Sequence, residues 1–362
     1  MAPVRCVLLL VLAGGACTAD ASRPPPSPTT TTVAASFGPA GEALIAFHSD
    51  PAGADDTYVM APNGREVTAV TDGMETIAQP FWSPDGNRLV VDCCASGPGT
   101  LFLLDGPGAE PVELAPDVDG ATAPAWSPDG SHIAFESVST RSLFVVDVSG
   151  TTPAAPVELL PGAGPSWSPD GSRIAYFAEV DGNTDIYSAA SDGTDVTRLT
   201  DDPRPDYSPR WSPDGERIAF VSERDGDQDI VVMAADGSAE IDGSAEIDVS
   251  DDPVVDDAPA WSPDGRSIAF VAYLHGADPF TIGQGDAEIF AVRADGRHRV
   301  DLSRNPAWDG DPAWSPDGRS IAFTRRTDHA QIYVMRSDGG DQHRLQGVSG
   351  SANDCCPAWR PR

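Results

Sequence analysis

The chain alternates short apolar runs with clusters of Gly, Pro, Asp and Ser, and this pattern indicates a protein built from β-strands. In residues 206–252, one apolar run ends at Trp211 and three more follow at 217–222, 229–235 and 246–250. None of these segments has ten or more residues of helical periodicity. The pattern predicts four short strands in about 45 residues, which is the content of one propeller blade.

A short sequence motif recurs within this pattern along most of the chain. The pentapeptide WSPDG occurs six times and PAWRP follows as a seventh copy, at spacings of 44, 41, 44, 50, 53 and 45 residues. Pro presets φ and Gly accepts a positive φ, so Ser-Pro-Asp-Gly predicts a tight hairpin between an inner strand and the next strand. We expect the recurring Trp to fill the wedge between blades. The copies begin at Trp82, Trp126, Trp167, Trp211, Trp261, Trp314 and Trp359.

The longer repeat unit points to a family. It reads P-x-WSPDG-x-x-IAF, followed by motifs such as GNTDIY at 182–187 and RLT at 198–200. This unit resembles TolB-like (WD-like) propeller repeats from about Gly41 to the C-terminus. The resemblance implies an all-β propeller engaged in protein–protein interaction in the cell envelope. We expect neither the N-terminal domain of TolB nor the hydrolase domain of related peptidases.

The two ends of the repeat region predict how the ring closes. Residues 43–49, 56–61 and 66–71 read as the second, third and fourth strands of a blade that lacks its inner strand, whereas 356–361 reads as an inner strand alone. We expect the C-terminal strand to complete the first blade, because this leaves no inner edge unpaired. The expected fold is a seven-bladed β-propeller of four-stranded antiparallel blades over residues 41–362.

The N-terminal segment reads as an export signal. Arg5 precedes the apolar run 7–13, which is too short to span a bilayer and is typical of a signal peptide within residues 1–21. Cleavage before Cys17 would produce a lipoprotein facing outside the cytoplasm, attached to the membrane only by lipid. Cleavage near Ala21 would release a secreted protein. Residues 22–40 are rich in Pro and Thr, which predicts a disordered tether.

Charge limits the partners. The formal net charge is -33 and the sequence pI is about 4.2, which argues against nucleic acid and favours a basic ligand, a basic envelope protein or a cation such as Ca²⁺. Acidic runs fall between the second and third strands and between the fourth strand and the next blade, so both emerge on one face. They could bind a partner, or they could only cap turns and keep loops soluble. The candidate binding residues are Asp201, Asp202, Asp206, Asp225, Asp227, Asp229, Asp251, Asp252, Asp256 and Asp257.

Two Cys doublets lie where the ring is expected to close. Cys93–Cys94 ends a second strand, and Cys355–Cys356 begins the inner strand of the neighbouring blade. Because both doublets should reach the same face of an exported protein, we expect disulfides between them. A bridge within each doublet or a four-thiolate metal site are the alternatives.

The residues that usually carry catalysis do not gather in the repeat. The six His residues occupy unlike positions, and the sequence has no G-x-S-x-G, H-E-x-x-H or phosphate-loop motif. The loop 272–288 is enlarged and is a candidate for recognition or for a local lid. We expect a monomeric, non-enzymatic scaffold that needs no cofactor. A hydrolase or lyase in the central channel, or a Ca²⁺-binding propeller, stays the alternative.

Overall fold

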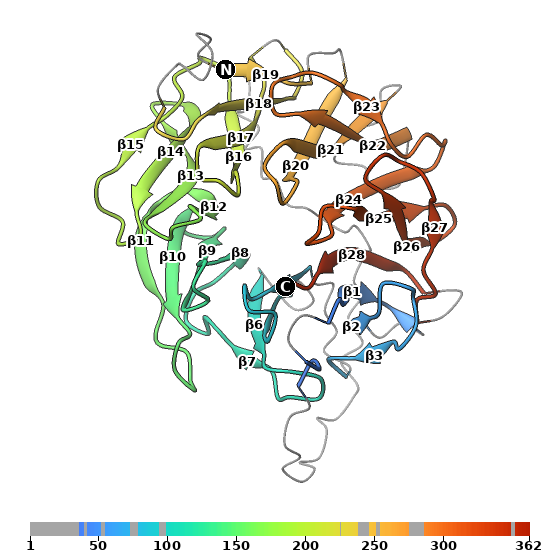
Figure 1. Ribbon diagram of the computed structural model, residues 1–362. Coiled ribbons are helices and arrows are strands. Elements are labelled where there is room, and N and C mark those ends of the chain that lie inside the picture. Colours follow the sequence, from blue (N-terminus) through green and yellow to red (C-terminus); the bar gives the residue numbers. More distant parts are fainter. Residues whose placement is uncertain are drawn as a thin grey trace.

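A computed structural model describes residues 36–39, 42–51, 55–72, 79–93, 99–224, 226–237, 246–250, 254–274, 286–348 and 352–362. Seven four-stranded antiparallel sheets stand as blades around a common axis (Figure 1). Within these ranges the secondary structure is strands and turns, and no helix there could cross a bilayer. The predicted seven-bladed all-β propeller is confirmed.

Each blade runs from an inner strand at the axis to an outer strand at the rim. Blade 1 consists of β28 (Asp354–Trp359), β1 (Ile45–Ser49), β2 (Asp56–Met60) and β3 (Thr68–Ala69). Blade 2 consists of β4 (Pro80–Trp82), β5 (Leu89–Cys93), β6 (Thr100–Leu104) and β7 (Val112–Glu113). Blade 3 consists of β8 (Ala121–Trp126), β9 (His132–Ser137), β10 (Ser142–Asp147) and β11 (Val157–Pro161).

The remaining four blades follow the same order. Blade 4 consists of β12 (Ala163–Trp167), β13 (Arg173–Val180), β14 (Asn183–Ala190) and β15 (Thr197–Arg198). Blade 5 consists of β16 (Asp206–Trp211), β17 (Arg217–Ser222), β18 (Asp229–Ala234) and β19 (Glu246–Asp248). Blade 6 consists of β20 (Val255–Trp261), β21 (Ser267–Leu274), β22 (Asp286–Arg293) and β23 (Val300–Asp301). Blade 7 consists of β24 (Trp308–Trp314), β25 (Ser320–Arg326), β26 (Ala330–Arg336) and β27 (His343–Arg344).

Blade 1 closes the ring as the sequence predicts. β28 pairs antiparallel with β1, and Ile45 lies opposite Trp359 in the register. In Figure 1 the last strand, β28, lies directly beside β1 and completes the circle. The two ends of the repeat region therefore share one sheet, and every inner strand is paired.

The Ser-Pro-Asp-Gly turns have the predicted hairpin geometry. In blade 3, Ser127 Oγ donates to Asp129 at 2.6 Å, and the same hydroxyl accepts the N–H of His132 at 2.9 Å. Gly130 has a φ of 68°, which a side chain would strain. These hydrogen bonds lower the pKa of Asp129 to about 2, so its carboxylate stays ionised at neutral pH. The turn Asp residues are thus parts of the hairpin.

The repeated Trp residues link neighbouring blades by hydrogen bonds as well as by packing. The indole N–H of Trp126 donates to the carbonyl of Phe81, one residue before the Trp of the preceding blade, at 3.1 Å. Six of the seven make this contact at 3.0–3.1 Å, and among the described residues the indole N–H of Trp211 has no acceptor. A nearly complete belt of such bonds surrounds the axis.

The inner strands carry a bulge that the sequence did not predict. In blades 1 and 3–7 the residue three before the Trp has a positive φ, and the register of the inner strand shifts there. Such a bulge turns a backbone N–H out of the ladder and requires another acceptor. The bulge residues are Ala123, Gly164, Ser208, Ala258, Asp311 and Cys356.

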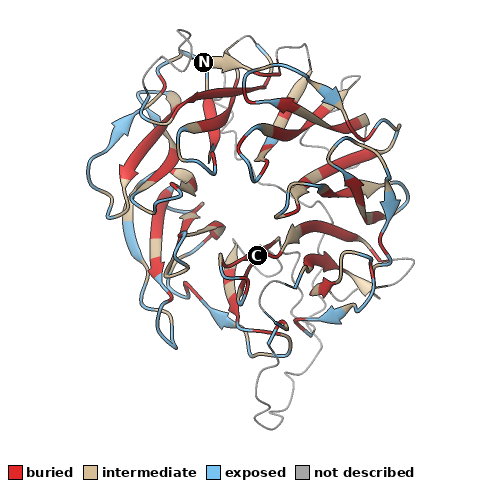
Figure 2. Cartoon of the chain, viewed as in Figure 1, coloured by how far each residue is buried: buried red, intermediate tan, exposed pale blue. Residues whose placement is uncertain are grey.

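The core lies between the blades. The second strands, with sequences such as Ile-Ala-Phe at 268–270, are buried on both faces, and the buried residues in Figure 2 concentrate along the middle of each blade. Opposed aromatic pairs stack across the second and third strands, for example Phe135 on Phe144 with centroids 5.6 Å apart. Neighbouring blades are therefore held together by apolar side chains that pack in wedges of nearly equal shape.

Part of the predicted tether packs on the propeller. Phe37 is buried and meets Trp82 edge-on, with ring centroids 4.8 Å apart. The guanidinium of the buried Arg360 donates to the carbonyls of Phe37 and Pro39, both at 3.1 Å. The expected boundary at residue 41 was therefore too late, because the ordered packing already includes Phe37. Residues 1–35 lie outside the described part of the chain.

Candidate functional site

Three of the predicted acidic binding residues are buried inside blades. Asp206 and Asp256 lie at or next to the start of inner strands, each with an Arg guanidinium 3.6 Å away, from Arg224 and Arg299 respectively. Asp229 accepts a hydrogen bond from Ser250 Oγ at 3.2 Å. The expectation that these three belong to an exposed acidic face was wrong, because each satisfies a partner within the blades.

The other predicted carboxylates divide by exposure. Asp201 is exposed, and Asp202 and Asp227 are half-buried. The carboxylate of Asp202 accepts the N–H of Arg204 at 2.9 Å, as expected of a loop Asp. Asp225, Asp251 and Asp252 lie outside the described residues. Only three of the predicted residues are thus seen at this face.

The last predicted residue, Asp257, belongs to a group near the axis. We call Asp92, Glu136, Arg210 and Asp257 the axial cluster; they come from blades 2, 3, 5 and 6. The carboxylates of Asp92, Glu136 and Asp257 accept the N–H of a bulge residue, at 3.1, 2.7 and 2.6 Å. These acceptors satisfy backbone donors that the bulges turn out of the strand ladder.

Burial perturbs the charges of the axial cluster. It raises the pKa of Asp257, with Arg210 opposing the shift. It raises the pKa of Glu136 as well, and the nearby charge of Asp92 adds to this. Burial lowers the pKa of Arg210, while Asp257 and Glu136 act in the opposite direction. The charge of Arg210 therefore interacts with carboxylates from two other blades. When all four groups of the axial cluster are ionised, their formal charge is -2 (-3 + 1).

Arg210 keeps solvent-accessible surface, although the protein around its guanidinium partly desolvates it. Its guanidinium donates to the carbonyl of Pro209 at 3.1 Å. It makes no ion pair with the carboxylates that the structure describes. The carboxylates of the axial cluster are thus fixed by backbone hydrogen bonds but form no ion pair among the described residues. The cluster lies in the half of the ring toward the acidic loops.

The structure does not bring metal ligands together in its described parts. Across the residues that are placed, no three His, Cys, Asp or Glu side chains converge as a metal site. His48 is buried 3.3 Å from Asp55, and His132 lies on the opposite face of the ring. Since several loop carboxylates fall outside those parts, a Ca²⁺ site in the loops stays a prediction.

The structure describes the side chains of only one of the two Cys doublets. Cys355 and Cys356 are buried, hold free thiols in the described chain, and pack with Ala330 of blade 7. The side chains of Cys93 and Cys94 lie outside what the structure describes. The cross-link between the doublets therefore stays a prediction.

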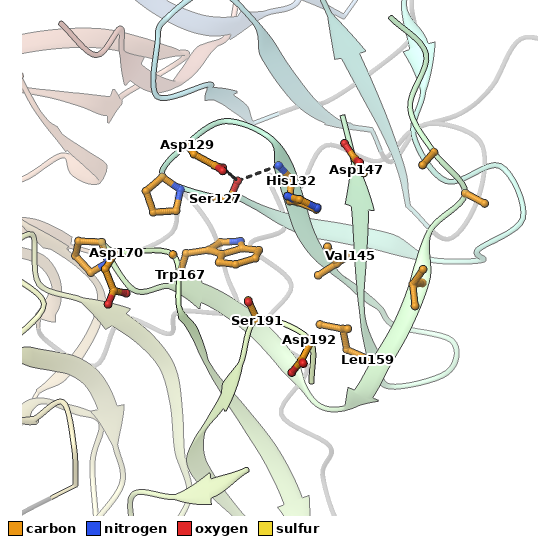
Figure 3. Close-up of a pocket in the computed structure, with 16 residues that line it drawn as sticks. Ser127, Asp129, His132, Val145, Asp147, Leu159, Trp167, Asp170, Ser191 and Asp192 are labelled. Carbon is orange, nitrogen blue, oxygen red and sulfur yellow. Dashed lines mark hydrogen bonds between the residues drawn. The ribbon is translucent and has the colours of Figure 1, made fainter. Parts of the chain in front are cut away.

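A groove opens between blades 3 and 4 on the face of the Ser-Pro-Asp-Gly hairpins. Its volume is about 780 Å³. Figure 3 shows the Trp167 indole in the middle of it, with His132 and Asp147 on one side and Leu159 and Asp192 on another. Sequence reasoning missed it, because its signal was the single His at a position where three other repeats carry Arg.

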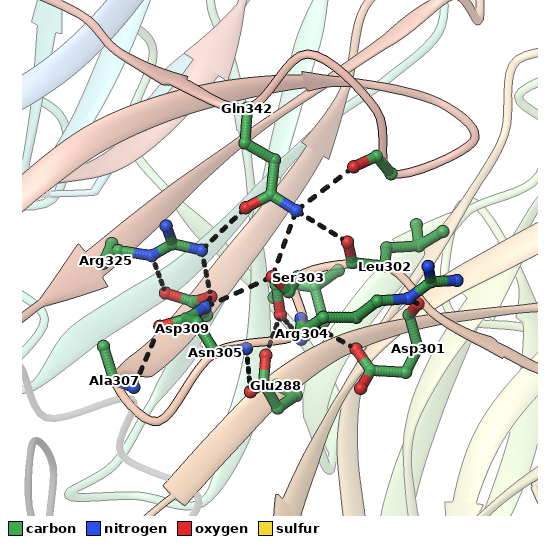
Figure 4. A network of polar contacts seen from close by, with 12 residues as sticks. Glu288, Asp301, Leu302, Ser303, Arg304, Asn305, Ala307, Asp309, Arg325 and Gln342 are labelled. Atoms are coloured by element: carbon green, nitrogen blue, oxygen red, sulfur yellow. Dashed lines mark hydrogen bonds and ion pairs between the residues drawn. The ribbon is translucent and has the colours of Figure 1, made fainter.

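A polar network joins blades 6 and 7 (Figure 4). Arg325 binds Asp309 through two hydrogen bonds of 2.8 Å and also donates to Gln342 at 3.0 Å. Glu288 accepts from Ser303 Oγ and from the N–H of Asn305, the latter at 2.7 Å. Burial raises the pKa of Glu288 to about 7. These contacts satisfy buried charges between blades, which is a structural role.

Comparison with known proteins settles the family. The sequence pattern of the TolB beta propeller domain matches residues 100–245 and 239–362, more than half of the chain. The chain belongs to the TolB β-propeller domain family. The resemblance expected from the repeat unit is therefore confirmed.

Solved structures with a similar fold show how widely this fold is used. The chain is similar to TolB from Acinetobacter baumannii at 19% identity and a TM-score of 0.52, over 85% of this chain and 79% of that one. It is also similar to an oligogalacturonate lyase solved in complex with manganese, at 18% identity and a TM-score of 0.57, over 85% of each chain. At such identities the likeness shows the fold alone.

One curated relative matches at higher identity over a short stretch. The "Uncharacterized peptidase YuxL" of Bacillus subtilis (strain 168) is 42% identical over 53 residues, which are 14% of this chain and 8% of that protein. The chain thus spans a small fraction of that relative's length.

Proposed function

We propose that this chain is a non-enzymatic, monomeric scaffold outside the cytoplasm that binds a basic envelope protein or basic ligand. Binding takes place at the axial end that carries the acidic loops. The axial cluster is the observation that supports this proposal. In it the charge of Arg210 interacts with Glu136 and Asp257 from two other blades, Asp92 lies near Glu136, and none of these groups forms an ion pair among the described residues.

The physical reason is electrostatic. A cationic group that enters near Glu136 and Asp257 would gain from two carboxylates whose charge is costly to keep unpaired. The same contact would favour their ionised forms and so reverse the raised pKa of each. The net charge of -33 extends this attraction to long range at low salt.

Export and anchoring complete the proposal. The apolar run 7–13 would direct secretion, and lipid attached to Cys17 would hold the propeller at the membrane through the Pro/Thr-rich segment. Labelled palmitate should enter the wild-type protein but not Cys17→Ser. No labelling of either protein would leave only the secreted form, and equal labelling of both would show that the lipid is not attached to Cys17.

The binding proposal is tested by capture from envelope extract. The purified propeller should retain a specific protein at about 50 mM salt and release it at about 500 mM, since screening weakens exposed charge pairs. A Glu136→Gln/Asp257→Asn variant should lose the partner. The matched control, Glu113→Gln/Glu158→Gln, removes equal charge from exposed outer strands and should keep it.

The results separate binding from chemistry. The proposal fails if no protein is retained at either salt, or if the axial variant captures as well as the control. A hydrolase or lyase would instead use these carboxyls for acid–base steps. Turnover of glycan or peptide that the axial variant loses and the control keeps would replace the scaffold with an enzyme.

A further inference from the structure

The groove between blades 3 and 4 has an apolar floor and a charged rim. Trp167, Val145 and Leu159 form the floor, and the connection 148–156 contributes Ala154 and Ala155 to one wall. Four carboxylates line the groove, from two Ser-Pro-Asp-Gly turns and two turns between third and fourth strands. They are Asp129, Asp147, Asp170 and Asp192.

These four carboxylates are ionised and have no cationic partner in the described chain. Hydrogen bonds from nearby Ser and Thr residues lower the pKa of each of them. The hydrogen bonds to the carboxylate of Asp129 come from Ser127 and Ser131, which are neutral. A floor of apolar atoms under four uncompensated negative charges fits a ligand that is both cationic and partly apolar.

Two other repeats show what occupies the corresponding space. In blade 5 the guanidinium of Arg217 lies 5.1 Å from the ring centroid of Trp261 in blade 6. It donates to the carbonyl of Gly265 at 2.7 Å and pairs with Asp214 at 3.3 Å. Blade 2 repeats the arrangement, with Arg88 lying 5.0 Å from Trp126 and donating to the carbonyl of Gly130 at 2.7 Å.

Blade 3 has His132 at the position of Arg88 and Arg217. The imidazole is shorter, and its Nδ1 lies 2.7 Å from Ser131 Oγ in its own turn. Among the described residues no guanidinium covers Trp167. The three groups that hold Arg217 have counterparts here, and all three line the groove: the ring of Trp167, the carbonyl of Gly171 and the carboxylate of Asp129.

We propose that this groove binds an arginine side chain of a partner protein, which takes the place over Trp167 that Arg88 and Arg217 take over the Trp residues of their neighbours. The guanidinium stacks on the indole, donates to the carbonyl of Gly171 and pairs with Asp129. Its methylenes lie on the apolar floor. This site is on the hairpin face, opposite the axial cluster, and it does not depend on the function proposed above.

The chemistry favours arginine. A planar guanidinium can stack on an indole and keep its N–H groups in the plane for a carbonyl and a carboxylate, whereas an ammonium presents a single point charge. Charge alone would not select this groove, because the whole chain is acidic. The preference for arginine comes from the uncovered indole of Trp167 in register with the carbonyl of Gly171 and the carboxylate of Asp129.

The experiment follows the indole N–H signal of Trp167 by NMR while acetyl-Gly-Arg-Gly-amide is added to the whole protein. The matched peptide with citrulline, which is uncharged but of the same shape, is the first control. We expect the arginine peptide to bind about tenfold more tightly, the size of a partly desolvated cation–π contact. Equal shifts and affinities for both peptides would overturn the proposal.

Variants separate this groove from general attraction. His132→Arg supplies the missing guanidinium from within and should abolish binding, although it changes the net charge by only one. Asp129→Asn should weaken binding about threefold, whereas Asp264→Asn, at the same turn position in blade 6, should not. Thermal melts establish that each variant is folded. Unchanged affinity in both His132→Arg and Asp129→Asn would refute the site.

Discussion

Glu288 should make the stability of this propeller depend on pH, in the direction opposite to ordinary acid denaturation. The carboxyl is buried between blades 6 and 7, and burial raises its pKa from 4.5 to about 7. Between these values the native state holds a proton that the unfolded chain has lost. The free energy of unfolding therefore falls as the pH rises from about 4.5 to about 7. Above pH 7 the ionised carboxylate would cost at most about 3 kcal/mol.

Glu288→Gln removes this cost while keeping an acceptor for the N–H of Asn305. Urea unfolding followed by tryptophan fluorescence should give nearly equal stability for wild type and variant at about pH 4, where Glu288 is largely protonated in both the native and the unfolded state. At pH 8 the variant should be more stable, by up to about 3 kcal/mol. Glu158→Gln, on the exposed β11, should change neither value by more than about 0.5 kcal/mol. A difference between wild type and Glu288→Gln that is the same at both pH values would show that titration of Glu288 is not the cause.

Three further predictions concern the ring and its seam. Deleting residues 354–362 removes β28, so the protein should lose its cooperative thermal transition; a chain that still melts sharply would show that closure is dispensable. Trp126→Phe keeps an aromatic ring between the blades but removes the donor to the carbonyl of Phe81, so urea unfolding should show a loss of about 1–3 kcal/mol in the free energy of unfolding. An unchanged free energy of unfolding would show that this hydrogen bond does not stabilise the ring. Non-reducing peptide mapping of protein purified from outside the cytoplasm should find Cys93–Cys94 joined to Cys355–Cys356, and free thiols throughout would reject the cross-link.

The fold could be predicted from sequence because every blade solves the same packing problem with the same residues. The number of regularly spaced Trp residues predicted the number of blades. The unmatched strands at 43–71 and 356–361 predicted that β28 completes blade 1. Pro, Asp and Gly at fixed places predicted the hairpins because their φ preferences are local. Each of these signals depends on neighbours in the sequence or on a strict repeat.

The candidate site was harder, because it depends on contacts between blades. Asp206 and Asp256 read as surface acids in their loops, yet each is held inside its own blade by an Arg from another segment of that blade. The bulges are likewise invisible in a sequence in which Ala123 and Ala258 are ordinary strand residues. The axial cluster and the groove at Trp167 become visible only when the blades are placed around the axis.

Closure by β28 also has a consequence for how the chain folds. The pairing of β28 with β1 joins segments about as distant as the sequence allows, so the loop entropy of the whole ring is lost in one contact. Topologies of this kind fold slowly, because their non-local contacts must wait for that closure. The first blade cannot be completed until β28 has been synthesised. The ring consequently stays open while blades 2 to 7 are being made, and the exposed edge of β1 waits for a partner that comes about 300 residues later.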